Sequence, residues 1–119
     1  MNLSRNYILS GITELLVLFF LSKRDSYIYE LTQAISVFSE GCIELAQNTV
    51  YAVAYKLERE KKITEYSKVI GKKRTRVYYH LEESGKIYLE EQLEVFRNVI
   101  DGTQMIFKCL TPDWRIKNE

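Results

Sequence analysis

Residues 47–81 decide the fold of this chain, because the spacing of their apolar side chains changes partway along: QNTVYAVAYKLEREKKITEYSKVIGKKRTRVYYHL. In the first part, apolar residues recur three and four positions apart, which is the period of an α-helix. We therefore predict a helix over 47–61. The residues that set this period are Val50, Val53, Ala54 and Leu57.

The rest of the stretch predicts a β-hairpin. Residues 63–70 alternate in character, and residues 75–81 are rich in β-branched and aromatic side chains, as strands are. The turn between them, residues 71–74, carries three cations. The two strands would therefore meet at a strongly basic tip.

Helical spacing returns on both sides of this stretch. It predicts helices over 7–22 and 27–38, the second ending near Gly41, and a long helix over 83–109 that Pro112 terminates. The fold class that follows is mainly α with one small β-hairpin.

Three helices followed by a hairpin is the element order of a winged helix-turn-helix. The second and third helices would form the helix-turn-helix pair, and the hairpin would be the wing. We predict a winged helix-turn-helix DNA-binding domain over residues 1–82, a C-terminal dimerisation helix over 83–110 and a tail over 111–119.

Length and composition are those of one small domain. The chain has 119 residues, 46% of them hydrophobic, and its cysteines, Cys42 and Cys109, show no metal-binding or disulfide spacing. The apolar run over 15–21 is far shorter than the roughly 20 residues that span a bilayer. We expect a cytoplasmic protein without a metal, a cofactor or a membrane partner.

A net charge of +1 conceals an uneven distribution. Residues 56–76 carry nine Lys or Arg against three Glu, a net +6, which predicts a surface that binds a polyanion. In helix-turn-helix proteins the second helix of the pair reads base edges, while surrounding cations bind phosphate. We predict double-stranded DNA as the partner, bound through Gln47, Asn48, Thr49, Tyr51, Tyr55, Lys56, Arg59, Lys72, Lys73, Arg74 and Arg76.

The long helix over 83–109 predicts a homodimer. Its wide apolar stripe is too long for so small a domain to cover, and the simplest partner is the same helix of a second copy. A two-fold dimer would also present two recognition helices to two half-sites. The predicted interface residues are Leu89, Leu93, Phe96, Ile100 and Phe107.

Catalytic signals are absent from the sequence. It contains no nucleophile, metalloprotease or phosphate-loop motif, and its single histidine, His80, lies in a predicted strand. A different class stays open, namely a winged-helix protein-interaction module without specific DNA binding. The basic hairpin tip counts against it, because a pure interaction module has no need of that cluster.

Four pieces of the chain resemble the PadR-like family of transcriptional regulators: ELLVLFFL at 14–21, SYIYEL at 26–31, NTVYAVAYKLERE at 48–60 and RTRVYYHLEESG at 74–85. The resemblance is greatest to the short subgroup with one C-terminal dimerisation helix, which is similar to multidrug-sensing repressors. The positions that match the family pattern are Thr49, Tyr51, Leu57, Glu58, Arg76, Tyr78, Tyr79, Leu81 and Gly85.

The chain departs from the family pattern around the recognition helix. Ala46 stands where the family usually has a Ser-type cap, which makes Asn48 a candidate cap instead. Ala52 replaces a frequent Pro, and Lys61 replaces the Gly that usually ends this helix.

The resemblance implies a homodimer that represses promoters and, in some members, is released by a ligand. Drug-sensing relatives stack flat ligands between aromatic side chains at the dimer centre. On this basis, the residues expected to bind a flat aromatic small molecule are Gly11, Leu15, Phe96 and Ile100.

Overall fold

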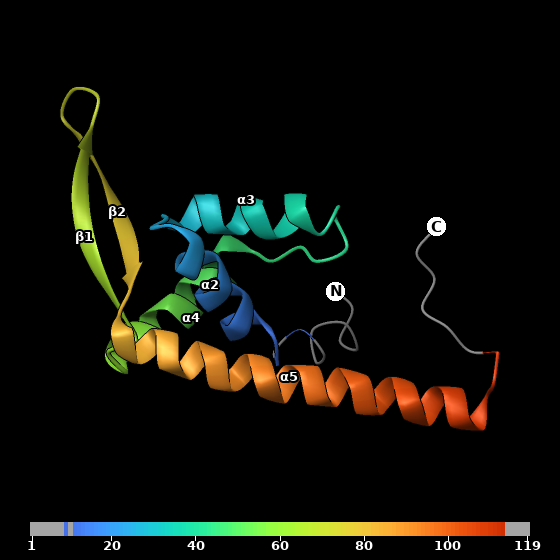
Figure 1. Ribbon diagram of the computed structural model, residues 1–119. Helices are drawn as coiled ribbons and strands as arrows, with labels where there is room; N and C mark the ends of the chain where they lie inside the picture. The colour runs from blue at the N-terminus through green and yellow to red at the C-terminus, as the bar shows by residue number, and fades with distance from the viewer. Residues whose placement is uncertain (1–8, 10, 114–119) are drawn as a thin grey trace. The chain divides into compact units, whose positions relative to one another are not determined.

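The computed structural model describes residue 9 and residues 11–113. These described residues form four helices and a two-stranded antiparallel hairpin, arranged as drawn in Figure 1, which confirms the predicted fold class. The helices are α2 (Thr13–Lys23), α3 (Ile28–Phe38), α4 (Gln47–Arg59) and α5 (Glu83–Leu110), and the strands are β1 (Ile63–Ile70) and β2 (Arg74–Leu81).

The chain divides into two compact units, one ending at Leu89 and the other beginning at Glu90. The first unit contains α2, α3, α4, the hairpin and the first turns of α5, and the second contains the rest of α5. The predicted division into a DNA-binding domain, a dimerisation helix and a tail stays a prediction.

The core of the first unit is built from all three early helices and the root of the hairpin. The apolar run over 15–21 supplies part of this core, since Val17, Leu18 and Leu21 are buried. Within residues 9 and 11–113, no helix is both long enough and apolar enough to cross a membrane. The largest fully buried side chains are Leu18, Leu31, Leu57, Ile63, Val17 and Val50.

Helix α2 begins later than the sequence predicts. The expected first residues, 7 and 8, lie outside the described part of the chain, but Gly11 lies in a turn and the helix starts at Thr13. Glycine disfavours a helix interior because it loses more backbone entropy there than other residues. The Thr13 hydroxyl also donates a hydrogen bond of 2.9 Å to the Leu9 carbonyl, which stabilises the turn.

Helix α4 ends two residues before the predicted position, in a Schellman motif. The Lys62 N–H donates to the Leu57 carbonyl and the Lys61 N–H donates to the Glu58 carbonyl, both at 2.9 Å. This pattern puts Lys61 in the left-handed region, with φ at 61°. Lysine therefore occupies a conformation that glycine adopts without steric strain.

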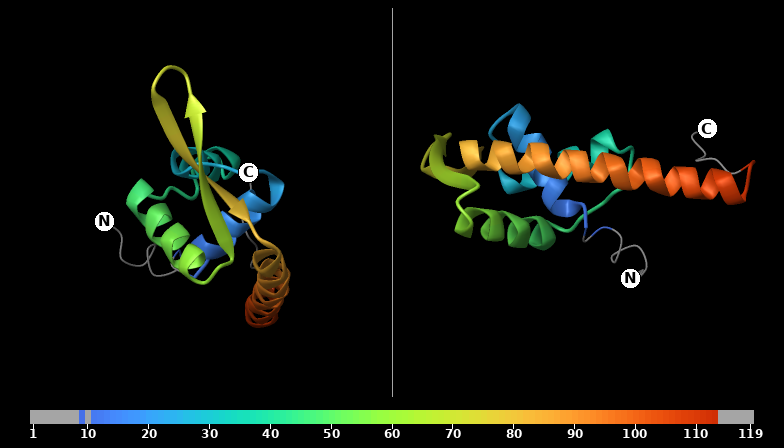
Figure 2. Two further views of the ribbon diagram at one scale, coloured as in Figure 1. Left: turned by 90° about the vertical axis from the view of Figure 1, so that its left-hand side faces the viewer. Right: turned by 60° about the horizontal axis from the view of Figure 1, so that its bottom comes forward.

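The hairpin is fastened to the helices at its root. Its strands pair in register from Ile63–Leu81 to Ile70–Arg74. Beside β2, Ser26 and Tyr79 exchange backbone hydrogen bonds of 2.8 and 3.3 Å. The loop between α2 and α3 thus acts as a one-residue third strand, while the tip extends away from the helices (Figures 1 and 2).

The start of α5 lies directly against the start of β1. A Cβ atom on Gly85 would stand 2.2 Å from the Lys62 carbonyl oxygen and 2.6 Å from Leu81 Cδ1. The same carbonyl accepts a hydrogen bond of 3.0 Å from the Glu82 N–H. Only a residue without a side chain leaves room for this approach.

We predict that Gly85→Ala lowers the free energy of unfolding by about 2–3 kcal/mol, because backbone must move to admit the methyl group. Gly102→Ala is the matched control, since its added Cβ would meet no described atom within 4 Å apart from its chain neighbours and the backbone of its own helix. That change should raise stability by about 0.5–1 kcal/mol, the usual helix preference for alanine. Urea unfolding followed by circular dichroism measures both, and equal effects would contradict the prediction.

Candidate nucleic-acid interface

Helix α4 has one buried and one exposed face. Val50, Ala54 and Leu57 are buried in the core of the first unit. The side chains between them are accessible, including the three amide and hydroxyl groups at the helix start. The predicted DNA-binding residues exposed on this helix are Gln47, Asn48, Thr49, Tyr51, Tyr55, Lys56 and Arg59.

The N-terminus of α4 corrects one expectation. Its cap residue is Ala46, whose side chain makes no capping hydrogen bond, and Asn48 is the second residue of the helix. The idea that Asn48 caps the helix is therefore wrong. Its amide lies exposed in the first turn, where helix-turn-helix proteins place base-contacting groups.

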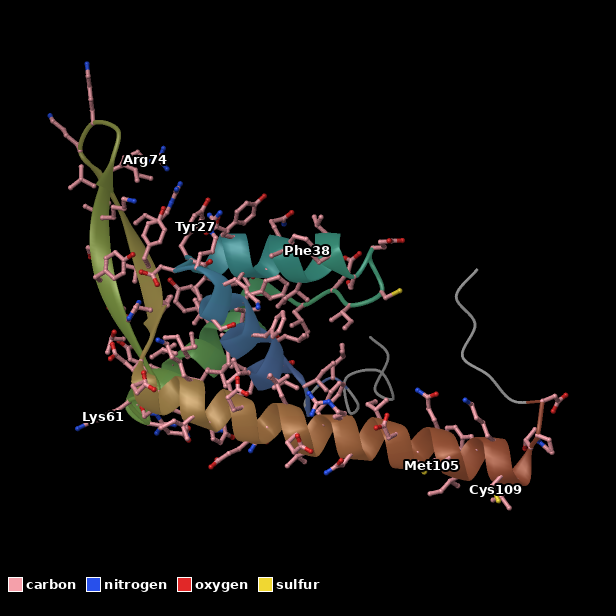
Figure 3. All side chains as sticks on the ribbon, in the orientation of Figure 1. Tyr27, Phe38, Lys61, Arg74, Met105 and Cys109 are labelled. Atoms are coloured by element: carbon pink, nitrogen blue, oxygen red, sulfur yellow. The ribbon has the colours of Figure 1, made fainter. Side chains whose placement is uncertain are left out.

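We define the wing tip as Lys72, Lys73 and Arg74. All three are exposed, and Figure 3 shows Arg74 near the end of the hairpin. Within residues 9 and 11–113, no ion pair involves any of them. Their mutual repulsion is uncompensated in the described part of the chain, which favours contact with an external anion.

Arg76 differs from the wing tip, because it lies against an aromatic group. Its guanidinium carbon stands 4.0 Å from the centre of the Tyr27 ring. Further along the hairpin, the Tyr66 and Tyr78 rings stack 5.8 Å apart, and Lys68 Nζ lies 5.3 Å from the Tyr78 ring centre. These contacts stiffen the middle of the wing.

The two cations of α4 have different surroundings. The Arg59 guanidinium lies 5.2 Å from the exposed Tyr55 ring. Lys56 Nζ instead donates a hydrogen bond of 2.5 Å to Glu14 Oε2, and it lies 3.8 Å from Glu60. The hydrogen bond with Glu14 raises the pKa of the Lys56 ammonium above its ordinary value.

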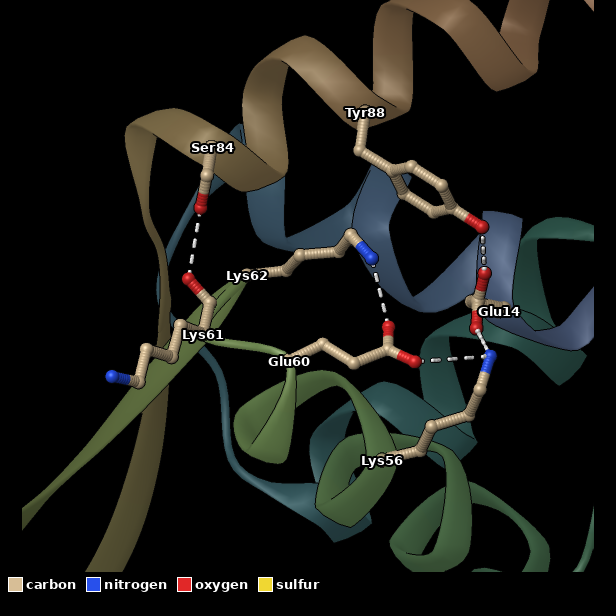
Figure 4. A network of polar contacts seen from close by, with 7 residues as sticks. All are labelled: Glu14, Lys56, Glu60, Lys61, Lys62, Ser84 and Tyr88. Carbon is tan, nitrogen blue, oxygen red and sulfur yellow. Dashed lines mark hydrogen bonds and ion pairs between the residues drawn. The ribbon is translucent and has the colours of Figure 1, made fainter.

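A polar network connects α2, α4 and the start of α5 through Glu14 (Figure 4). The Tyr88 hydroxyl donates to Glu14 Oε1 at 2.6 Å, while Lys56 binds the other oxygen. The hydrogen bond to Glu14 raises the pKa of the Tyr88 hydroxyl. The sequence analysis missed Glu14 and Tyr88, although a carboxylate beside the apolar run over 15–21 was the available signal.

Asp25 anchors both strands of the wing to the loop between α2 and α3. Its Oδ2 accepts a hydrogen bond of 2.7 Å from the Tyr66 hydroxyl, and its Oδ1 lies 2.9 Å from His80 Nδ1. Burial acts to raise the pKa of the Asp25 carboxyl, but the hydrogen bonds with His80 and Tyr66 outweigh it and lower that pKa. This carboxylate was also missed by the sequence analysis.

Comparison with known proteins identifies the family. The sequence model of the transcriptional regulator PadR-like family matches residues 17–91, more than half of the chain. The chain belongs to this family. As a PadR-like transcriptional regulator it is not an enzyme. A relative from Lysinibacillus sphaericus, named Uncharacterized protein X, is 30% identical over 95 residues, which cover 80% of this chain and 87% of the relative.

Solved PadR-like structures share the fold. A PadR-like regulator from Bacillus cereus superposes with a TM-score of 0.75 at 22% identity, covering 86% of this chain and 97% of that one. A PadR family regulator from Clostridium difficile R20291 gives 0.69 at 25% identity, covering 81% and 98%. Bacillus subtilis PadR, solved in complex with operator DNA, gives 0.64 at 24% identity, covering 69% and 45%. The predicted winged helix with a long C-terminal helix is confirmed.

The PadR-like pattern acquires a physical explanation at two positions. The family's usual Gly at the end of the recognition helix corresponds to Lys61, where the backbone has a positive φ of 61°. The matching Gly at the start of the last helix is Gly85, where a side chain would meet the Lys62 carbonyl. Position 61 requires a backbone with positive φ, and position 85 requires a residue without a Cβ atom, because the Lys62 carbonyl occupies that space.

The predicted dimer and ligand residues have different degrees of exposure. Leu89 is 4% exposed and belongs to the core of the first unit, so it has almost no surface to offer a second chain. Leu93 is half-buried, whereas Phe96, Ile100 and Phe107 are exposed. Of the other predicted ligand residues, Gly11 is exposed and Leu15 is half-buried.

We predict that Asp25→Asn lowers the free energy of unfolding at pH 7 by about 0.5–1 kcal/mol, because it removes the charge that holds the wing root. The folded-state pKa of Asp25 lies below its ordinary 3.8, so this stabilisation exists above pH 3.8 and disappears as the pH falls through the folded-state pKa. Urea unfolding at pH 7 and pH 3 measures it. The exposed Asp101→Asn is the control, and a difference as large at pH 3 as at pH 7 would refute the prediction.

Proposed function

We propose that this PadR-like regulator acts in the cytoplasm as a homodimeric repressor that binds double-stranded DNA. The observation that carries the proposal is that the cations of the wing tip have no ion-pair partner in the described chain. The wing tip also belongs to the same compact unit as the exposed face of α4. A second support is that a similar protein, Bacillus subtilis PadR, was solved with operator DNA.

Each part of the surface has its own task in this proposal. The side-chain amides of Gln47 and Asn48 suit adenine, which presents a donor and an acceptor in the major groove. Arg59 and the wing tip would bind phosphates, because guanidinium and ammonium groups supply charge and donors. Lys56 already shares its charge with Glu14, so it would contribute less than Arg59.

We predict that the double variant Lys72→Ala/Lys73→Ala binds a DNA duplex from upstream of the protein's own gene about 10-fold more weakly near 0.1 M salt. The loss follows from lost phosphate contacts, each of which contributes roughly 0.9 to the slope of log K against log salt. The slope should therefore become shallower in this variant. Fluorescence anisotropy of a labelled duplex at several salt concentrations measures both quantities.

The matched control is Lys86→Ala/Lys108→Ala, which removes the same charge from α5 and should leave affinity within about two-fold. A scrambled duplex tests specificity, and it should bind at least about 1,000-fold more weakly. Equal losses in the two variants would remove the wing from the proposal. No binding to any duplex at low salt would favour the protein-interaction module instead.

The homodimer is proposed from the second unit. Along α5 beyond Leu89, apolar side chains are exposed on one broad face, an arrangement that soluble proteins usually cover with a partner. A second copy presents an identical face, as a two-fold interface requires. The exposed apolar side chains of this face are Val95, Phe96, Val99, Ile100, Ile106, Phe107 and Leu110.

We predict that Ile100→Asp converts the dimer into a monomer, because an unpaired carboxylate would be buried in the apolar interface. Asn98→Asp is the matched control, since it adds the same charge to the same helix about half a turn away. Light scattering coupled to size-exclusion chromatography measures the mass. A dimer that survives Ile100→Asp, or two variants that behave alike, would place the interface elsewhere.

The proposal includes release from DNA by a flat aromatic small molecule that stacks on Phe96 near the dimer centre. It is supported by the exposure of Phe96 and by the resemblance to drug-sensing repressors. Phe96→Ala should abolish binding of such a ligand, as measured by calorimetry. Unchanged affinity in that variant would remove Phe96 from the ligand site.

A further inference from the structure

The first unit contains a hollow between α2 and α3 whose lining includes neither Phe96 nor any of the predicted DNA-binding residues. Its volume is about 460 Å³, which lies within the range of small-molecule sites. Three phenylalanines, Phe19, Phe20 and Phe38, form its aromatic wall, with Leu31 and Ala34 completing the apolar lining. The hollow is therefore large enough and apolar enough for an aromatic group.

The aromatic wall is open to solvent. Phe38, labelled on α3 in Figure 3, is 77% exposed, although its ring centre lies 5.8 Å from that of Phe20. The Phe19 and Phe20 rings meet edge to face at 6.2 Å. Smaller hollows of about 180 and 330 Å³ share Phe38 with the first, so the apolar surface continues on both sides of this ring.

One polar feature of the hollow is chemically incomplete. Glu30 lines it, and its Oε2 is paired with the Arg24 guanidinium. Its Oε1 is shielded from water and has no hydrogen-bond partner among the described residues. A carboxylate oxygen without a donor is costly when it is shielded from water, and the last torsion of a glutamate is soft enough to turn the oxygen toward a donor.

Lys23, Arg24 and Ser26 carry the donors in the lining, and none of them is hydrogen-bonded to this oxygen. The Ser26 hydroxyl instead donates to the Arg24 carbonyl at 3.3 Å. Arg24 is already bound to Oε2, and its side chain is 69% exposed, so solvent screens its remaining charge. Lys23 Nζ lies 4.8 Å from the Phe19 ring centre, where it forms a cation–π contact. A ligand that combines an aromatic body with an N–H donor would satisfy both the wall and the carboxylate.

We propose that the hollow between α2 and α3 binds arylalkylamines, in which an alkyl carbon joins the amine to the ring. The ring would lie on Phe19, Phe20 and Phe38 and the ammonium on Glu30 Oε1. Charge-assisted hydrogen bonds are about twice as strong as neutral ones, which favours an ammonium over a hydroxyl. This site goes beyond the proposed function, because it depends neither on DNA nor on Phe96.

The test uses the full-length protein and isothermal titration calorimetry with 1-naphthylmethylamine, 1-naphthylmethanol and 1-naphthylacetate. We expect the amine to bind at least about 10-fold more tightly than the alcohol, because only the amine carries a charge to the carboxylate. Glu30→Gln should remove this preference and leave binding of the alcohol nearly unchanged. The control Glu40→Gln alters an exposed residue outside the hollow and should keep the preference.

Phe38→Ala and Phe96→Ala separate this site from others. Because Phe38 is largely exposed, its removal should leave thermal unfolding intact while weakening binding of both the amine and the alcohol at the hollow. Phe96→Ala can remove binding of naphthyl groups at the proposed dimer-centre site, but it should leave the preference for the amine that depends on Glu30 unchanged. Equal binding of amine and alcohol, tighter binding of the acid, or an amine affinity unaffected by Glu30→Gln would each overturn the proposal. A Phe38→Ala protein that is monomeric in light scattering would also overturn the proposal. That result would mean that Phe38 lies in the dimer interface and that a second copy of the chain covers the hollow.

Discussion

The approach of the Gly85 backbone to the Lys62 carbonyl is the constraint on which the rest of the first unit depends. At this point α4 has just ended, β1 begins, β2 has just ended and α5 begins. The same carbonyl accepts the Glu82 N–H, and the Ser84 hydroxyl donates to the Lys61 carbonyl at 2.8 Å. The end of α4, the root of the wing and the first turn of α5 are therefore held together by these hydrogen bonds and by a close approach that leaves no room for a side chain at residue 85.

Cations near this junction are paired with carboxylates, whereas those of the wing tip have no ion-pair partner among the described residues. Near it, Lys56 and Lys62 are paired with Glu14 and Glu60, and this pairing lowers the pKa of the Glu60 carboxyl through the hydrogen bond from Lys62. At the wing tip the cations have no such partners in the described chain. The sequence places both groups in one basic segment, but only the second group keeps its charge for an external anion.

The sequence predicted the elements well because periodicity is local. The change of spacing after residue 61 identified both α4 and the hairpin, and the wing tip followed from three adjacent cations. The ends of elements were less predictable, since Gly11 lies in a turn and Lys61 adopts a left-handed conformation for which lysine gives no signal. The partners of Lys56 and Asp25 could not be read at all, because Glu14, Tyr66 and His80 lie 41 to 55 residues away along the chain.

The Ser26–Tyr79 bridge holds the wing near its root, so the tip can bend more easily than the root. Backbone and carboxylate bonds clamp its root to the loop before α3, whereas the ladder continues through four further residue pairs, from Ser67–Val77 to Ile70–Arg74. Bending is easiest beyond the contact between Arg76 and Tyr27, where the ribbon has only two strands. In the proposed complex with DNA, the cations at the free end would follow phosphates on grooves of different width while the root of the wing and α4 stay in place. Tolerance of DNA shape and selection of sequence would then reside in separate parts of the first unit.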